Sequence, residues 1–352
     1  RSTVRNEMVD FWAVATSPVA VNKFFHTVLS GWVLGAIFVV GVSAWFLLKK
    51  RHKEFALQSI KIGAMFGLVS TLLSAWTGDG SGYQVAKTQP MKLAAMEGYY
   101  EGREGAGLVA VGLLNPDKEK YNDGKDPFIF RVEIPQMLSL LAKRELNAFV
   151  PGVKDIIEGG YVQKDGTVAL SAAEKIERGK KAIAALASYR SAKKEGNTAT
   201  ADSAYVTLQE NMAYFGYGYI KDVHHLVPNV PITFYAFRIM VMLGFYFILF
   251  FAVVLFLVYK DKLAEMKWMH WIALLTIPLG YIAAEAGWVV AECGRQPWAI
   301  QDLLPTSASV SRVSVGSVQL TFYIFLVLFT VMLIAEVGIM LREIKKGPEL
   351  NK

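Results

Sequence analysis

The sequence predicts an all-α integral membrane protein with five transmembrane helices and one large external insertion. Its 352 residues are 53% hydrophobic and only 19% charged, and the mean hydropathy is +0.33, which is more apolar than a soluble chain requires. Five separate runs are long enough to cross a bilayer, which takes about 20 apolar residues. A hydrophilic stretch, residues 78–231, separates the second run from the third.

The five predicted spans share a composition that is apolar on all sides, aromatic near the ends and nearly free of charge, unlike the one-sided stripe of a soluble helix. They are Phe24–Leu48, Phe55–Trp76, Ile232–Tyr259, Trp268–Ala291 and Val318–Leu341. We therefore divide the chain into two first spans (1–77), an external domain (78–231) and three last spans with a tail (232–352).

Basic residues predict the orientation, because Lys and Arg collect on the cytoplasmic side of short loops. Loop 49–54 holds four of them in six residues, loop 260–267 holds three, and the tail from Arg342 holds four. The segment before the first span and loop 293–317 together hold only five. We expect the external domain on the outer side and the C-terminus in the cytoplasm. This topology explains the net charge of +7, so no nucleic-acid partner is expected.

The external domain is expected to be partly helical and functional, since connections this long usually carry function. Ser171 and Glu174 form a capping box at the start of a stretch rich in Ala, Lys and Glu that runs to about Glu195. Residues 164–167, with the sequence KDGT, predict a hairpin turn.

Two further features limit the chemistry. The lone Cys293 excludes an intramolecular disulfide and any Cys-based zinc or iron–sulfur site. The first residue is Arg1 and not Met, so we expect a piece of a longer polypeptide.

A charged side chain inside a span costs about 2.5–3.5 kcal/mol, so each one needs a partner or a function. The residues with polar or metal-ligating side chains lie near the predicted outer face. They are His26, Arg238, Met240 and Glu292. Imidazole and thioether can be the two axial ligands of a low-spin haem iron, and a nearby arginine can neutralise a propionate. The alternative is structural: a hydrogen-bonded histidine, a space-filling methionine and a snorkelling arginine.

The end of the fourth span carries a second group. Glu285, Trp288 and Glu292 recur at three and four residues and therefore share a helical face. Such a face indicates a cofactor or a proton path, or else an interfacial belt of Glu and Trp. We interpret Lys61, His270 and Glu336, which lie near cytoplasmic ends, as snorkelling side chains without a role.

Four motifs resemble those of one family. Residues 292–298, ECGRQPW, closely resemble the GRQPW signature of the large subunit of cytochrome bd quinol oxidases (subunit I). Residues 23–28, KFFHTV, and 236–240, AFRIM, resemble its segments bearing the low-spin haem histidine and methionine. Residues 78–83, GDGSGY, followed by 92–97, KLAAME, resemble the start of its quinol-binding loop. The similarity runs from about residue 6 to 342 and is weakest over 98–230.

The resemblance implies a role for each matching residue. His26 and Met240 would ligate the iron of a low-spin haem b, with Arg238 beside it. Lys92 and Glu97 would bind and oxidise quinol. These roles imply quinol oxidation at the outer face, with protons released outward and electrons passed inward.

The resemblance also implies two high-spin haems, a haem b and a haem d. Glu292 would ligate the iron of one of them, Trp288 would lie between haems, and Arg295 is the signature arginine. In the nine-span family fold, this chain would be the last five spans, so the four spans before them, with a histidine ligand and proton-path carboxylates, would be missing.

As a whole, the resemblance implies a quinol:oxygen oxidoreductase in the bacterial cytoplasmic membrane that reduces oxygen to water and contributes to the proton motive force. Its expected partners are a second oxidase subunit, small accessory subunits, membrane lipid, and ubiquinol or menaquinol. The alternative function is a non-catalytic membrane subunit whose external domain serves in binding or assembly.

Overall fold

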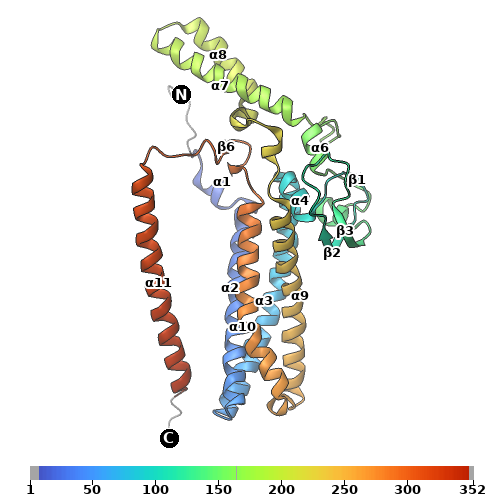
Figure 1. Cartoon of the computed structure of the whole chain (residues 1–352), viewed down its shortest axis with the longest axis vertical. Helices are drawn as coiled ribbons and strands as arrows, with labels where there is room; N and C mark the ends of the chain where they lie inside the picture. The colour runs from blue at the N-terminus through green and yellow to red at the C-terminus, as the bar shows by residue number, and fades with distance from the viewer. Residues whose placement is uncertain (1–7, 164, 349–352) are drawn as a thin grey trace. The chain divides into compact units, whose positions relative to one another are not determined.

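The computed structural model describes residues 8–163 and 165–348. Within them, five helices are long and apolar enough to cross a membrane (Figure 1). They are α2 (Pro18–Leu48), α3 (Lys53–Thr88), α9 (Val230–Tyr259), α10 (Lys267–Cys293) and α11 (Val315–Lys346). Each contains one of the five predicted spans, which confirms their number and order.

The helix that contains the second predicted span extends beyond it, because α3 continues from Trp76 to Thr88 through a glycine-containing stretch. The side chain of Asn22 on α2 stabilises this extension. Its amide donates to the Thr77 carbonyl oxygen at 3.0 Å and to Ser81 Oγ at 2.7 Å. A Cβ built on Gly80 would lie 3.0 Å from Asn22 Oδ1, so the glycine permits the close approach of the two helices.

Close packing divides the chain into two compact units. The first comprises Arg1–Ser30, Thr71–Tyr246 and Tyr281–Ser309, and the second comprises Gly31–Ser70, Phe247–Gly280 and Val310–Lys352. The division runs through α2, α3, α9 and α10, so each unit holds part of each helix. The predicted division at residues 77 and 231 follows chain order and stays a prediction.

The first unit contains all the shorter elements apart from one turn. Its helices are α1 (Phe11–Ala15), α4 (Pro90–Glu97), α5 (Met137–Lys143), α6 (Val153–Glu158), α7 (Ala172–Lys194), α8 (Thr198–Asn211), η1 (Met212–Tyr219) and η2 (Val223–Leu226). Its strands are β1 (Arg103–Glu104), β2 (Leu108–Leu114), β3 (Phe128–Ile134), β4 (Phe149–Val150), β5 (Trp298–Ile300) and β6 (Leu304–Pro305).

The strands form three antiparallel pairs, β1–β4, β2–β3 and β5–β6, so the all-α prediction is too strict for a chain that is mostly helical. The sequences of β2, LVAVGLL, and β3, FIFRVEI, are rich in the β-branched and aromatic residues that favour strands. Leu108 of β2 pairs with Ile134 of β3, and Leu114 with Phe128.

The long helix α7 begins where the capping box predicted. The Ser171 side chain accepts a hydrogen bond from the Glu174 backbone N–H, and the Glu174 carboxylate accepts one from the Ser171 N–H. Helices α7 and α8 lie side by side as a hairpin (Figure 1). The predicted turn at 164–167 includes Lys164, which lies outside the described residues, but Val162 and Val168 on either side pair antiparallel.

The second unit has a core of small and branched apolar side chains. A Cβ built on Gly41 of α2 would lie 2.6 Å from the Ile277 side chain of α10, and one built on Gly67 of α3 would lie 2.3 Å from Phe251 of α9. These glycines therefore permit close helix contact. By contrast, no residue of the described helix α11 is buried. Its C-terminal carbonyls at Lys345 and Lys346 accept hydrogen bonds from Arg51.

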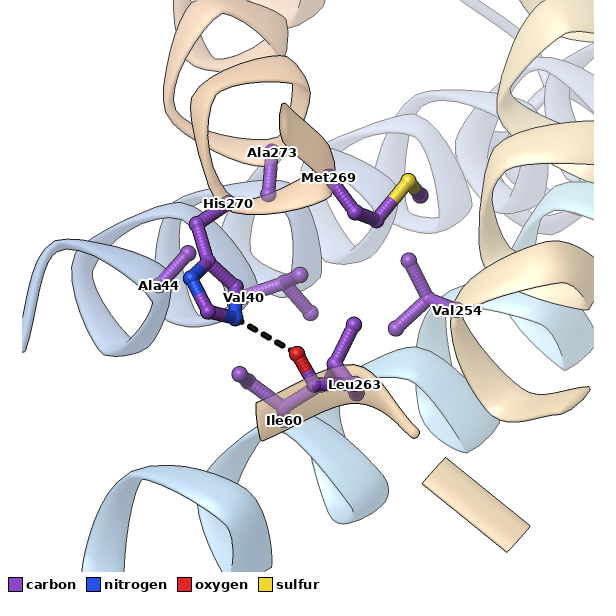
Figure 2. A pocket seen from close by; sticks show the side chains of 8 residues that line it. All are labelled: Val40, Ala44, Ile60, Val254, Leu263, Met269, His270 and Ala273. Carbon is purple, nitrogen blue, oxygen red and sulfur yellow. Dashed lines mark hydrogen bonds between the residues drawn. The ribbon is translucent and has the colours of Figure 1, made fainter. Parts of the chain in front are cut away.

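The snorkelling interpretation of His270 is wrong. Its side chain is 2% exposed and lies among apolar side chains of α2, α3, α9 and α10 (Figure 2). Its Nε2 donates to the carbonyl oxygen of Leu263, in the turn η3 (Leu263–Glu265), at 2.8 Å. A backbone carbonyl within reach therefore accepts the Nε2 proton of this buried side chain. Lys61 is half-buried, with its ammonium 4.8 Å from the Tyr259 ring centroid, and Glu336 is exposed.

Candidate functional site

The eight residues predicted for the site come from four helices and the segment that follows α10, yet all of them lie in the first unit. They are His26, Lys92, Glu97, Arg238, Met240, Trp288, Glu292 and Arg295. The remainder of this unit is the external domain and the adjoining helix ends. The predicted residues therefore belong to one compact body.

His26 on α2 is held by α3. Its Nδ1 lies 3.1 Å from the carbonyl oxygen of Ser74 and 3.0 Å from Thr77 Oγ1. A carbonyl oxygen only accepts, so Nδ1 carries the proton and Nε2 carries the lone pair. No hydrogen bond joins Nε2 to any described residue. A backbone carbonyl that fixes the tautomer through the other ring nitrogen is the usual support of a metal-ligating histidine, so His26 fits an iron ligand.

Met240 on α9 is half-buried against a core cluster of the first unit. A Cβ built on Gly287 of α10 would lie 3.0 Å from its sulfur, so the thioether occupies space that glycine leaves free. The two predicted ligands of one haem therefore have different neighbours, α3 for His26 and α10 for Met240. A thioether has no proton to lose and suits a soft axial position.

Arg238, two residues before Met240, forms a buried ion pair with Glu97 of α4. Arg238 Nη2 and Glu97 Oε2 lie 2.5 Å apart, and the two residues are 7% and 3% exposed. Nη1 of the same guanidinium lies 3.5 Å from the Met96 carbonyl oxygen. Its Nε is buried without a hydrogen-bond partner among the described residues. The arginine thus neutralises one carboxylate and retains a donor for another anionic group.

Burial raises the pKa of Glu97, against the effect of the Arg238 charge and hydrogen bond, which lower it. Two aromatic rings complete the environment: the Arg238 guanidinium carbon lies 4.6 Å from the Phe234 ring centroid and 5.2 Å from that of Phe237. A carboxyl group with a raised pKa close to a fixed cation is suited to accept and release a proton.

Lys92 lies five residues before Glu97 on α4, and its side chain reaches the end of α10. Its ammonium donates to the Ala291 carbonyl oxygen at 3.2 Å. Burial, then the charge of Lys23, lowers the Lys92 pKa to about 8; Glu292 opposes this shift and Arg295 adds to it. The lysine is therefore a donor close to the midpoint of its titration at mildly alkaline pH.

Gln89, directly before α4, is a site candidate that the sequence reasoning missed. Its side-chain oxygen Oε1 is buried without a hydrogen-bond partner among the described residues, and it precedes Lys92 by three residues, which places the two on one side of the chain. An unpartnered buried acceptor requires a donor from elsewhere, such as a ligand hydroxyl. No motif singled it out, since a glutamine in a polar loop is unremarkable in sequence.

The predicted polar face of α10 is present. Trp288 is 62% exposed and Glu285 is also exposed, whereas Ala286 and Val290, on the other side of the helix, are buried. Glu292 Oε2 forms an ion pair with Arg295 Nη2 at 2.7 Å. The structure thus brings Lys92 to the end of α10 and pairs Glu97 with Arg238. The Trp288 side chain remains exposed.

Comparison with known proteins gives one family. The profile of the family described as cytochrome bd terminal oxidase subunit I matches residues 1–348. Cytochrome bd-II ubiquinol oxidase subunit 1 of Escherichia coli (strain K12) is 34% identical over 98% of this chain and 66% of its own length. Cytochrome bd ubiquinol oxidase subunit 1 of Bacillus subtilis (strain 168) is 30% identical over 98% of this chain and 60% of its own.

A solved structure shares the fold. The structure of bd oxidase from Geobacillus thermodenitrificans matches with a TM-score of 0.67 and 23% identity, over 96% of this chain and 61% of that chain. This chain thus spans about two thirds of the length of the relatives it matches. The family match covers residues 1–348 as a whole and lends no support to the prediction that four family spans are missing. With five span-like helices, the family match identifies a bacterial membrane protein.

Proposed function

Because this chain belongs to the cytochrome bd terminal oxidase subunit I family, we propose that it is the haem-bearing subunit of a membrane quinol oxidase that oxidises quinol at the outer face and reduces oxygen to water. The observation that carries the proposal is the geometry of His26, whose Nδ1 is fixed by the Ser74 carbonyl oxygen at 3.1 Å. This hydrogen bond leaves Nε2 as a neutral nitrogen ligand.

In this proposal His26 and Met240 hold the iron of a low-spin haem b, and Arg238, through its unpartnered Nε, binds a propionate. Glu292 is the proposed iron ligand in one of two high-spin haems, a haem b and a haem d, beside Trp288 and Arg295. When bound, these groups would take up electrons and support oxygen reduction. The exposed face with Glu285 and Trp288 has the open surface that a large planar group requires, with an indole ring on it.

The chain's own residues handle the quinol and its protons. Gln89 Oε1 is the proposed acceptor for one quinol hydroxyl, and the Lys92 ammonium donates to the other quinol oxygen. Glu97, with its raised pKa, accepts a proton when the quinol is oxidised. The Arg238 charge stabilises the carboxylate after that proton leaves toward the outer side.

The proposed setting follows from the same assignment. Residues 78–231 face the outer side of the bacterial cytoplasmic membrane, and the C-terminus faces the cytoplasm, as the distribution of Lys and Arg predicts. A second oxidase subunit and small accessory subunits are the proposed partners, ubiquinol or menaquinol is the proposed substrate, and the reaction contributes to the proton motive force.

A visible spectrum of the reduced minus the oxidised protein tests the proposal, with Met240→Leu as the variant. We expect a low-spin b-type signal in the unchanged protein and its conversion to a five-coordinate haem in Met240→Leu, because leucine cannot ligate iron. Met242→Leu, two residues further along the same helix and 56% exposed, is the matched control. An identical spectrum in Met240→Leu and the control would rule out the assigned ligand, and no haem signal in any folded sample would favour a binding or assembly subunit.

A further inference from the structure

The short ribbon of β5 and β6 directly follows the segment that carries Glu292 and Arg295. Trp298 begins β5 and pairs with Pro305 of β6. Asp302 forms the turn between the strands with φ of 59°, a left-handed conformation that Asp and Asn tolerate better than most residues. Its backbone carbonyl accepts a hydrogen bond from the Gly216 N–H of η1 at 3.2 Å. The ribbon is thus tied to a distant part of the external domain.

Tyr217 of η1 contacts both ends of this ribbon. Its hydroxyl donates to Asp302 Oδ1 at 2.7 Å, and its ring packs edge-on against the Trp298 ring, with centroids 4.9 Å apart. Burial and, second, the neighbouring Asp302 carboxylate raise the pKa of Tyr217. The phenol therefore stays protonated and acts as a donor over the physiological pH range. The Lys175 ammonium of α7 lies 5.7 Å from the same ring and offsets the Asp302 charge.

Two glycines of η1 permit its close contact with the β5–β6 ribbon and with α7. A Cβ built on Gly216 would lie 2.5 Å from the Asp302 carbonyl oxygen, and one built on Gly218 would lie 2.5 Å from the backbone carbon of Gly179 on α7. Real Cβ atoms do not approach backbone so closely, so η1 is held between α7 and the ribbon by backbone packing. Tyr217, between the two glycines, has little freedom to choose another partner.

The ribbon is also joined to the Lys92 region. Trp298 is 5% exposed and lies in one core cluster with Ala94 of α4, two residues after Lys92. Four residues before Trp298, a Cβ built on Gly294 would lie 3.2 Å from the Lys92 side chain. Any shift of β5 therefore changes the backbone against which Lys92 packs.

We propose that Tyr217 is a positioning residue for the quinol site: by donating its hydroxyl to Asp302 and packing on Trp298, it fixes the β5–β6 ribbon and with it the end of α10 against Lys92. This inference rests on the proposed function for the identity of the bound substrate. The α7–α8 hairpin and η1 then support the site from the outer side of the ribbon.

Tyr217→Phe, in the complete haem-loaded oxidase assembly, tests this role because it removes only the hydroxyl. We expect the KM for a short-chain ubiquinol to rise about three- to tenfold, the effect of losing one hydrogen bond. Turnover with a one-electron donor that needs no quinol site and the haem spectrum should be unchanged. Amide hydrogen exchange in residues 298–305 should become several-fold faster.

Two variants serve as controls. Tyr214→Phe removes a hydroxyl of the same short helix that forms no hydrogen bond with a described residue, and it should leave the KM and the exchange unchanged. Asp302→Asn keeps an acceptor oxygen and tolerates the left-handed turn, so it should weaken quinol binding less than Tyr217→Phe does.

An unchanged KM in Tyr217→Phe, or an equal change in Tyr214→Phe, would overturn the proposal. So would loss of haem or of quinol-independent turnover in Tyr217→Phe, because the residue would then support folding as a whole. If the unchanged protein does not oxidise quinol, the proposed function fails, and the exchange measurement still decides whether Tyr217 fixes the ribbon.

Discussion

The two units differ in how they treat buried polar groups. The first unit buries an ion pair between Glu97 and Arg238. Three buried polar side-chain atoms of the first unit lack partners among the described residues, and one of the second unit, His270 Nδ1, does so as well; those of the first unit are Gln89 Oε1, Tyr99 Oη and Arg238 Nε. In the second unit the buried polar side chains are Ser43, Ser70, Thr276 and His270. Hydroxyls of this kind bond to the preceding helical turn, as Thr276 does to the Ile272 carbonyl oxygen at 2.8 Å.

Under the proposed function, this difference distinguishes a unit that carries the site from a unit that supports it. Burial of charge costs several kcal/mol and does not by itself stabilise a fold, so apolar replacements are often equally stable. In the proposed function, the first unit retains these groups for chemistry. The second unit instead uses glycine contacts and branched side chains, which satisfy packing without desolvating a charge.

The largest expected effect is that of Glu97→Gln, which leaves the Arg238 charge buried and unpaired. We expect the free energy of unfolding to fall by about 3–5 kcal/mol and quinol turnover to fall at least about tenfold, since the proton acceptor is lost. Denaturation in detergent, followed by loss of helical signal, measures the stability.

The double variant Glu97→Gln with Arg238→Gln should recover part of the stability, because no charge is then left without a partner. Glu177→Gln is the surface control: its carboxylate pairs with Lys180 at 2.8 Å on the exposed face of α7, and such exposed pairs contribute little to stability. If Glu97→Gln costs no more than Glu177→Gln, the buried pair is not what distinguishes the first unit.

A smaller effect on quinol turnover is expected from the titration of Lys92, whose pKa is lowered to about 8. The ammonium is charged below that pH and neutral above it, so turnover at low quinol concentration should fall as the pH rises through about 8. Turnover of Lys92→Met at pH 7 should be about tenfold slower, which is the effect of losing one charge-assisted hydrogen bond. Its turnover should not fall as the pH rises through about 8. Lys92→Arg should keep the charge and move the fall to higher pH.

The free energy of unfolding should change with pH in the direction opposite to turnover. The unfolded lysine keeps its proton up to about pH 10.5, so between about pH 8 and 10.5 the unfolded state binds more protons and the free energy of unfolding rises with pH. Lys92→Met should remove this rise. A turnover profile that is the same in Lys92→Met and in the unchanged protein would show that the Lys92 charge takes no part in quinol binding.

The span pattern of the fold could be predicted because a bilayer requires long apolar runs, and each of the five runs lies within an observed helix. The extension of α3 to Thr88 could not, because its glycines disfavour a helix and the compensating contact comes from Asn22, more than fifty residues earlier. Likewise β2 and β3 are too short and too weakly alternating to stand out within a polar insertion.

For the proposed site, sequence reasoning named the residues but did not predict their pairing. Arg238 and Glu97 are far apart in the chain, and no local rule joins them into an ion pair. Gln89 and Tyr217 were missed because their significance lies in burial and in one partner each. His270 was misread since its Leu263 partner is a backbone carbonyl, which no side-chain pattern reveals.

The smallest expected effect is that of His270→Leu in the second unit, and it tests whether that unit is a scaffold. The variant removes one hydrogen bond to the Leu263 carbonyl oxygen, which costs about 1 kcal/mol. It also removes Nδ1, a buried atom without a partner among the described residues, which offsets part of that cost. The haem spectrum and the KM for quinol should therefore equal those of Met269→Leu, a neighbouring apolar substitution in the same core (Figure 2). A lost haem signal in His270→Leu alone would place chemistry in the second unit as well.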